Sequence, residues 1–203
     1  MVRRLVLGAL ALGLTACAPL GTPTGAPAPV ARLASGIVVT GPQGYCVDPE
    51  ISRPARGFAF LAACAALDPA SEVAAPGALA LITVQSGAPR SATVRGSETA
   101  FRDFLRTEEG TALLGAGDIG GPVALLSSDV SENTVAVYTR NRAPGAIAGT
   151  QAESWRLFTD LGDRVVTVTV RGIAEAPLSR TGSRDLLETT LRALRAANPE
   201  RAS

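Results

Sequence analysis

From about residue 37 onward, the chain alternates short apolar, β-branched runs with clusters of turn residues. Each run has the length and composition of a β-strand, and the intervening Gly, Pro, Asn and Asp residues favour turns. The runs cover residues 37–40, 45–48, 58–65, 79–85, 122–126, 134–140, 155–159 and 165–171. Residues 161–164 predict the clearest hairpin. After it, valines alternate with threonines from 166 to 170, which predicts one buried face.

Two stretches have helical spacing instead. Ser97 can cap a middle helix that carries Phe101 and Phe104, and Gly110 is expected to end it, with a short turn over residues 111–114. Residues 183–196 carry a leucine-rich stripe at helical spacing, which must cover apolar surface. Runs of strands with a few separated helices predict an α+β fold. We expect an antiparallel sheet of about six to seven strands with a middle helix and a C-terminal helix packed on it.

The first 35 residues follow a different pattern. Arg3 and Arg4 precede an apolar run from 5 to 14, and the motif Leu14-Thr15-Ala16-Cys17 follows. The run is about half the ~20 residues that a spanning helix needs. These residues resemble the signal and lipobox of a bacterial lipoprotein precursor. The resemblance implies a diacylglycerol thioether on Cys17, cleavage just before it and acylation, for instance with palmitate, of its new amino group. An ordinary secretory signal or a short membrane anchor is the alternative.

Prolines and glycines dominate residues 18–35, so neither helix nor strand is expected to persist there. The domain boundaries follow: a signal peptide over 1–16, a lipid anchor and tether over 17–35, one α+β domain over 36–198, and a disordered tail over 199–203. A fully extended polyproline tether would reach roughly 55 Å. In the lipoprotein resemblance, Ala18 after the lipidated cysteine implies the periplasmic face of the outer membrane, with the inner membrane or the cell surface as alternatives.

Cys46 and Cys64 remain as an even pair once Cys17 carries lipid, and an oxidising compartment favours a disulfide between them. Antiparallel pairing centred near Ala55 would set the two cysteines opposite each other. The closed loop would stabilise the domain by roughly 3 kcal/mol in the chain-entropy model. Two buried thiols are the alternative.

The order of elements also resembles the PsbP-like α/β/α sandwich. The resemblance rests on the strand Gly44-Tyr45-Cys46-Val47-Asp48, the middle helix, and the strand beginning Asp163-Arg164-Val165 before the terminal helix. It covers most of residues 37–198 as a pattern of elements. It implies a fold and assigns no functional residue.

The amino-acid composition excludes several classes of catalytic and binding site. The chain has 19 basic residues, all of them arginine, and 18 acidic residues. Without Arg3 and Arg4, 17 basic residues (19 − 2) face 18 acidic ones. This near-neutral charge argues against a nucleic-acid partner. The absence of histidine excludes Ser-His-Asp and Cys-His catalysis, and the absence of lysine excludes Schiff bases and Walker-type phosphate loops. Gly115, Gly117 and Gly120 match G-x-G-x-x-G, but a helix precedes them and a strand follows, the reverse of the dinucleotide-binding order. We therefore expect no cofactor and no metal.

Two sets of candidate residues remain. The carboxylates that acid/base hydrolysis would need are Asp48, Glu108, Glu109, Asp118 and Asp129. A long loop beginning Arg140-Asn141-Arg142 and followed by Trp155 is the candidate contact surface, although Trp155 and Tyr138 also suit a core.

The function that we expect is a membrane-anchored cell-envelope lipoprotein that acts as a binding or assembly module for an envelope protein, and not as an enzyme. A metal-independent carboxylate hydrolase, marked by two converging acids, is one alternative. A small-ligand carrier, marked by an apolar cavity, is the other.

Overall fold

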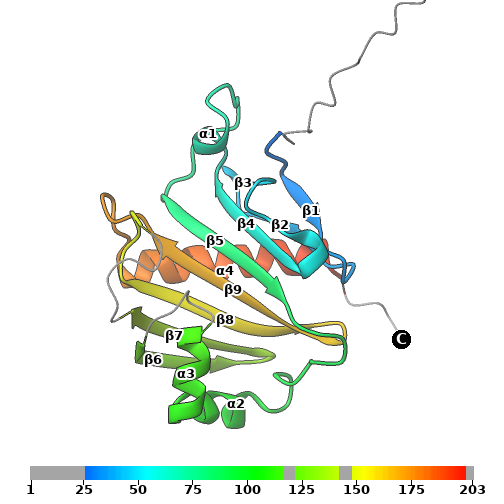
Figure 1. Ribbon diagram of the computed structural model, residues 1–203, viewed down its shortest axis with the longest axis vertical. Coiled ribbons are helices and arrows are strands. Elements are labelled where there is room, and N and C mark those ends of the chain that lie inside the picture. Colours follow the sequence, from blue (N-terminus) through cyan, green and yellow to red (C-terminus); the bar gives the residue numbers. More distant parts are fainter. Residues whose placement is uncertain (1–25, 117–121, 142–147, 200–203) are drawn as a thin grey trace, which may run out of the picture.

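A computed structural model describes residues 26–116, 122–141 and 148–199. Within these ranges seven strands form one sheet in which every neighbouring pair is antiparallel. Their order across the sheet is β3 (Tyr45–Val47), β4 (Phe58–Ala63), β5 (Ala80–Ser86), β9 (Arg164–Gly172), β8 (Glu153–Leu161), β7 (Thr134–Asn141) and β6 (Val123–Ser131) (Figure 1). The predicted α+β class with an antiparallel sheet is confirmed.

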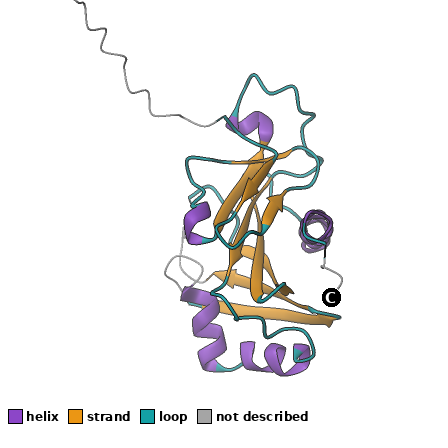
Figure 2. Ribbon diagram, turned by 90° about the vertical axis from the view of Figure 1, so that its right-hand side faces the viewer, coloured by secondary structure: helices purple, strands orange, loops and turns teal. Residues whose placement is uncertain are grey.

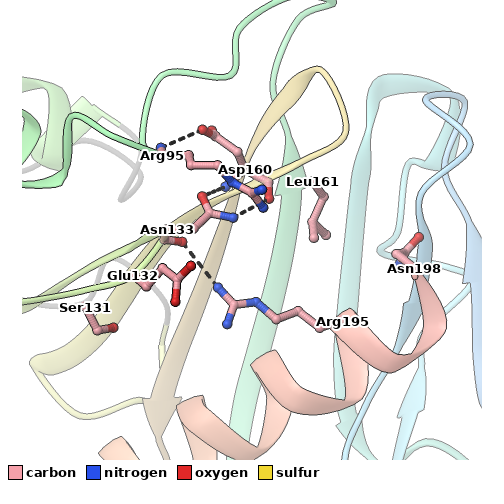
Figure 3. Close-up of a pocket in the computed structure, with 8 residues that line it drawn as sticks. All are labelled: Arg95, Ser131, Glu132, Asn133, Asp160, Leu161, Arg195 and Asn198. Atoms are coloured by element: carbon pink, nitrogen blue, oxygen red, sulfur yellow. Dashed lines mark hydrogen bonds between the residues drawn. The ribbon is translucent and has the colours of Figure 1, made fainter. Parts of the chain in front are cut away.

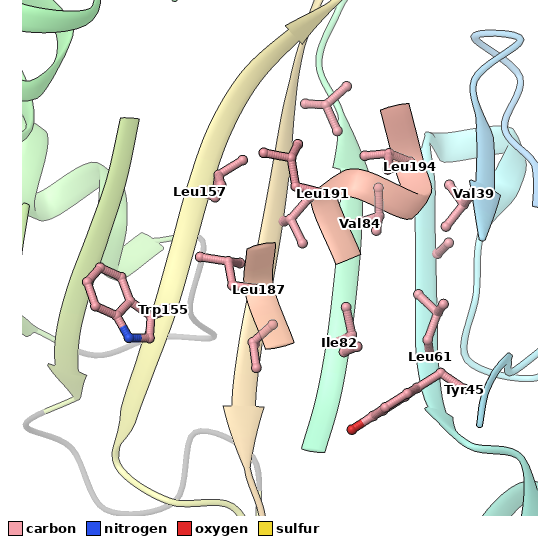
Figure 4. Close-up of a cluster of buried hydrophobic side chains, with 14 of the residues drawn as sticks. Val39, Tyr45, Leu61, Ile82, Val84, Trp155, Leu157, Leu187, Leu191 and Leu194 are labelled. Carbon is pink, nitrogen blue, oxygen red and sulfur yellow. The ribbon is translucent and has the colours of Figure 1, made fainter. Parts of the chain in front are cut away.

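The C-terminal helix α4 (Arg180–Ala197) covers one face of this sheet. Ser179 caps it by accepting a hydrogen bond from the Gly182 N–H at 3.0 Å. The leucine stripe, Leu187, Leu191 and Leu194, packs into the main core (Figure 4). The core residues that it meets include Val39, Leu61, Ile82, Val84, Leu157 and Val168. The apolar face of this amphipathic helix is therefore buried in the main core, as the pattern predicted.

Two shorter helices, α2 (Glu98–Leu105) and α3 (Glu108–Ala116), lie over β6 and β7. They enclose a second core cluster that contains Leu105, Leu114 and Phe158, and the ring of Phe101 meets that of Phe158 edge-on at 5.3 Å. Phe158 and its neighbour Leu157 belong to different clusters, and successive strand residues point to opposite faces. The helices α2 and α3 thus cover the face opposite α4 (Figure 2).

The predicted helix break at Gly110 is wrong. Gly110 lies inside α3, and the chain turns before it, where the Thr107 hydroxyl accepts from the Gly110 N–H at 3.1 Å. A Cβ atom on Gly110 would collide with the backbone of Phe104 and Leu105. This glycine therefore allows the close approach of two helices and does not end one.

The fold begins earlier than the expected boundary at residue 36. Strand β1 (Val30–Arg32) pairs with β2 (Val38–Thr40), and Leu33 between them is only 2% exposed. Ala28 already exchanges two backbone hydrogen bonds with Val47, at 2.7 and 3.3 Å. Apolar residues at the end of this stretch belong to a short hairpin, so the predicted tether ends some residues before 35.

The connection from β3 to β4 contains the 3₁₀ turn η1 (Pro54–Arg56) and is closed by the Cys46–Cys64 disulfide, with an S–S distance of 2.09 Å. The predicted register is wrong by two residues, because Cys46 lies opposite Ala62. Cys64 follows β4 as the first residue of the short helix α1 (Cys64–Leu67), and the two Cα atoms are 4.8 Å apart. The bond thus crosses diagonally from β3 to the end of β4.

Strand β6 forms one edge of the sheet. Its register against β7 shifts between Leu125 and Ser127, so that Leu126 bulges out and is 42% exposed.

None of the described helices is long and apolar enough to cross a membrane.

Candidate functional site

A polar pocket of about 590 Å³ opens where the β6–β7 turn, the end of β8 and the end of α4 meet (Figure 3). Its lining carries two arginines, two acids and two asparagines. The lining residues are Arg95, Ser131, Glu132, Asn133, Asp160, Leu161, Arg195 and Asn198.

Asn133 forms the turn that closes one side of the pocket. Its φ of +49° is a conformation that asparagine tolerates better than most residues. Its side chain accepts from the Asp160 N–H and donates to the Asp160 carbonyl, both at 3.0 Å. The amide thereby replaces a backbone partner and docks the turn onto β8.

Asp160 is only 7% exposed and uses its carboxylate to hold the segment before α2. One oxygen accepts from the Thr93 N–H at 3.1 Å, and the other accepts from Val94 at 2.8 Å and Arg95 at 2.9 Å. A carboxylate occupied by three backbone donors is suited to positioning a loop.

Arg195 ties the end of α4 to the seven-stranded sheet, and Asn198 ties it to β2. One Arg195 Nη donates to the Asn133 carbonyl and to the Thr134 and Thr159 hydroxyls at 3.0–3.3 Å. The Asn198 side chain pairs with both backbone groups of Val38, at 2.7 and 2.8 Å. The pocket wall is thus mainly a polar scaffold that joins three elements.

Glu98, at the start of α2, extends this scaffold by accepting from the Asn133 N–H at 2.8 Å. Hydrogen bonds from backbone N–H groups, first its own and then those of Asn133 and Gly96, lower the pKa of Glu98 below its usual value, with a smaller contribution from Arg95.

The carboxylates predicted as an acid/base pair lie elsewhere. Asp48 accepts from the Glu50 and Ile51 N–H groups in its own loop, Glu108 and Glu109 begin α3, and Asp129 lies within β6. None of these four lines the pocket, and Asp118 lies outside the described residues. In the described ranges, no group of three or more Cys, Asp or Glu side chains is arranged to hold a metal. Gly115 belongs to α3, and Gly117 and Gly120 are also outside the described residues.

A second site lies beside the predicted contact loop, on the α4 side of β6–β8. We call Tyr138, Arg140, Arg180 and Arg184 the arginine–aromatic surface. The Arg180 guanidinium lies over the rings of Tyr138 and Trp155, at 5.3 and 5.7 Å, and Arg184 lies 4.7 Å from the Trp155 centroid. Arginine stacked on an aromatic face is held in place and remains able to bind an anion.

The three arginines differ in their ionic partners. Arg140 pairs with Glu153 at 2.7 Å, and Arg184 pairs with Asp129 at 2.6 Å and with Glu188 at 2.8 Å. Exposed Arg180 donates instead to the Ser127 hydroxyl at 2.6 Å, and no carboxylate of the described residues lies within ion-pair distance of it. Burial, and secondarily the charge of Glu153, raises the pKa of Tyr138.

The structure divides the residues of the predicted contact loop. Arg140 is exposed at the end of β7, whereas Asn141 beside it is 7% exposed. Trp155 is 2% exposed and donates its indole N–H to the Arg180 carbonyl, so it is a core residue that supports the surface from below. Arg142 lies outside the described residues.

Sequence reasoning missed Arg180 and Arg184 at this surface and Asp160 and Arg195 at the pocket. Arg180 precedes the predicted helix start at 183, although its spacing of four from Arg184 places both on one helix face. Asp160 lies in a strand of mixed polar and apolar residues, so no local pattern marked its buried contact.

No protein-family model matches the chain, and no curated protein matches it. Among solved structures, the Ran-binding protein Mog1p of Saccharomyces cerevisiae aligns over 83% of this chain and 90% of its own, with 11% identity and a TM-score of 0.44. A similarity at this level carries no argument about function.

Proposed function

We propose that the protein is a lipid-anchored lipoprotein of the bacterial cell envelope that acts as a binding or assembly module. The lipobox ending in Cys17 supports the anchor, and Ala18 favours the periplasmic face of the outer membrane. The Cys46–Cys64 disulfide suits the oxidising compartment that this address implies.

The module binds its partner through the arginine–aromatic surface. One observation carries this proposal: Arg180 is exposed, stacked on Tyr138, and has no carboxylate partner among the described residues. Arginine and tyrosine are enriched where protein interfaces concentrate their binding energy. A guanidinium held by an aromatic ring also loses little freedom when it binds, which favours affinity.

The chemistry of the surface indicates the kind of partner. An exposed guanidinium matches a carboxylate of a partner, and the buried Tyr138 ring beneath Arg180 holds it in place. The partner is therefore an envelope protein that presents an Asp or Glu side chain to Arg180.

Site-specific crosslinking in cells tests this function. A photo-crosslinking amino acid in place of Arg140, in the otherwise unchanged full chain, should capture one discrete envelope protein. Arg180→Ala should reduce that product at least tenfold, as expected for a lost interfacial charge pair of about 1.4 kcal/mol or more.

Arg192→Ala is the matched control, because Arg192 is an exposed α4 residue whose side chain contacts only Thr189 on its own helix. It should leave the crosslink unchanged. Equal crosslinking by Arg180→Ala and Arg192→Ala, with both proteins present at wild-type levels, would overturn the assignment of this surface.

A further inference from the structure

The described chain starts at the end of the molecule that carries α1. In two perpendicular views, this start and the loop over residues 68–79, which follows α1, lie at the same end, whereas α2 and α3 lie at the other (Figures 1 and 2). Strand β3 joins the two features. Val47 pairs with Ala28, and the Tyr45 hydroxyl donates to the Ala78 carbonyl at 2.7 Å.

The chain between the proposed anchor and this end is short. Only residues 18–25, eight residues (25 − 17), separate Cys17 from the first described residue. A fully extended chain of this length spans roughly 30 Å. The two backbone hydrogen bonds between Ala28 and Val47 hold the chain against β3. The link to Cys17 can therefore gain almost no further length.

This length restricts how the domain can face a membrane. A compact domain of this size has a diameter of about 40 Å, so the path over its surface from one end to the other is about 60 Å. A link of at most half that length cannot reach around to present the α2–α3 end to the bilayer. Whenever Cys17 is anchored, the α1 end therefore stays within roughly 30 Å of the lipid, and the α2–α3 end cannot turn to face it.

The exposed residues of this end fit that location. Val73 and Leu79 are each 46% exposed, and alanines and prolines surround them. The sequence has no arginine between Arg56 and Arg90, and the loop carries two acids, Asp68 and Glu72. Such a surface suits zwitterionic headgroups better than anionic ones, because it offers aliphatic contact and no basic residues.

We infer that the α1 end of the domain, including the loop over residues 68–79 with its exposed Val73 and Leu79, rests on the zwitterionic surface of the bilayer that holds the acyl chains of Cys17. The inference depends on the proposed lipid anchor. It also gives the domain a fixed orientation, in which α2 and α3 point away from the membrane.

Spin labelling of the full-length acylated protein in phosphatidylcholine vesicles tests this orientation. A nitroxide at Val73→Cys should gain collisions with oxygen and lose those with a water-soluble nickel complex, each at least threefold relative to the Cys17→Ser protein, which stays in solution. The same label at Leu113→Cys should show no change, because Leu113 is 55% exposed on α3 at the opposite end.

Four outcomes are distinct. Mass spectrometry that finds no acyl group on Cys17 overturns the proposed anchor, and this inference with it. An acylated, vesicle-bound protein whose label at residue 73 stays accessible to nickel overturns the orientation alone. Spin–spin broadening at residue 73 without vesicles indicates that a second copy covers the loop over residues 68–79 and also overturns the inference. Lipid contact at residue 73 but not at residue 113 supports it.

Discussion

Asn133 does with its side chain what a strand residue does with its backbone. It pairs with both main-chain groups of Asp160, while Asp160 in turn holds the segment before α2. The sequence predicts a turn between the runs 122–126 and 134–140 but not this contact, because the paired residues are 27 positions apart and no local pattern links them. The polar pocket was therefore beyond sequence reasoning, although its turn was not.

Glu98 makes the acid stability of this region testable. Its pKa is lowered in the folded protein from a usual value of 4.5, so its ionised form contributes stability above that pH, which is lost as the pH falls through the folded value. We expect Glu98→Gln to lose less free energy of unfolding between pH 7 and pH 3 than the wild type. Urea unfolding at the two pH values measures the difference.

Glu109→Gln, which changes an exposed acid in the first turn of α3, is the control and should behave as the wild type. An acid-induced loss for Glu98→Gln as large as that of the wild type would contradict the role given to its backbone hydrogen bonds.

At the scale of the elements, hydrophobic periodicity predicted the described sheet well and the helix ends poorly. The alternation in β9 and the turn at 162–163 appear as predicted, because one buried face determines a strand register. Gly110 misled the prediction, since its role in close packing depends on α2, which lies against it. Leu33 was missed because Val30 is the only other large apolar residue between Pro29 and Gly36, and two such residues show no periodicity.

The Cys46–Cys64 bond can be tested as an element that closes the β3–β4 connection. The double variant Cys46→Ala/Cys64→Ala should lower the free energy of unfolding by roughly 3 kcal/mol, the value for a loop of this length. Urea unfolding measures it, and a reducing agent should destabilise the wild type but not the variant. Mass spectrometry of unreduced, alkylated protein should find one linked peptide pair; two alkylated cysteines in protein from the periplasm would count against the bond.

At the scale of the whole molecule, the early start of the fold changes what the anchor does. A tether of 18–35 would let the domain search a wide volume, whereas fixing the chain at Ala28 halves that length.

The candidate contact surface was predicted in part: Arg140 belongs to it, but Trp155 is buried beneath it. Arg180 was missed because only the tertiary fold brings the start of α4 over β7 and β8.

The anchor itself is the remaining prediction. Cells given a clickable fatty acid should label the wild-type protein and not Cys17→Ser, because the thioether and the new amino terminus both require Cys17. Protein capture followed by in-gel fluorescence measures the label. Equal labelling of both proteins would remove the lipoprotein assignment.

The bulge in β6 has a consequence for proteins held in a membrane plane. Copies held by the proposed lipid anchor would meet side by side, and a regular sheet edge would then pair with the edge of a neighbour. At Leu126 the strand has one residue too many for such a ladder, and three residues later Asp129, on the same edge strand, forms an ion pair with Arg184. The irregular edge of β6 therefore disfavours sheet-to-sheet pairing between copies held by the proposed anchor.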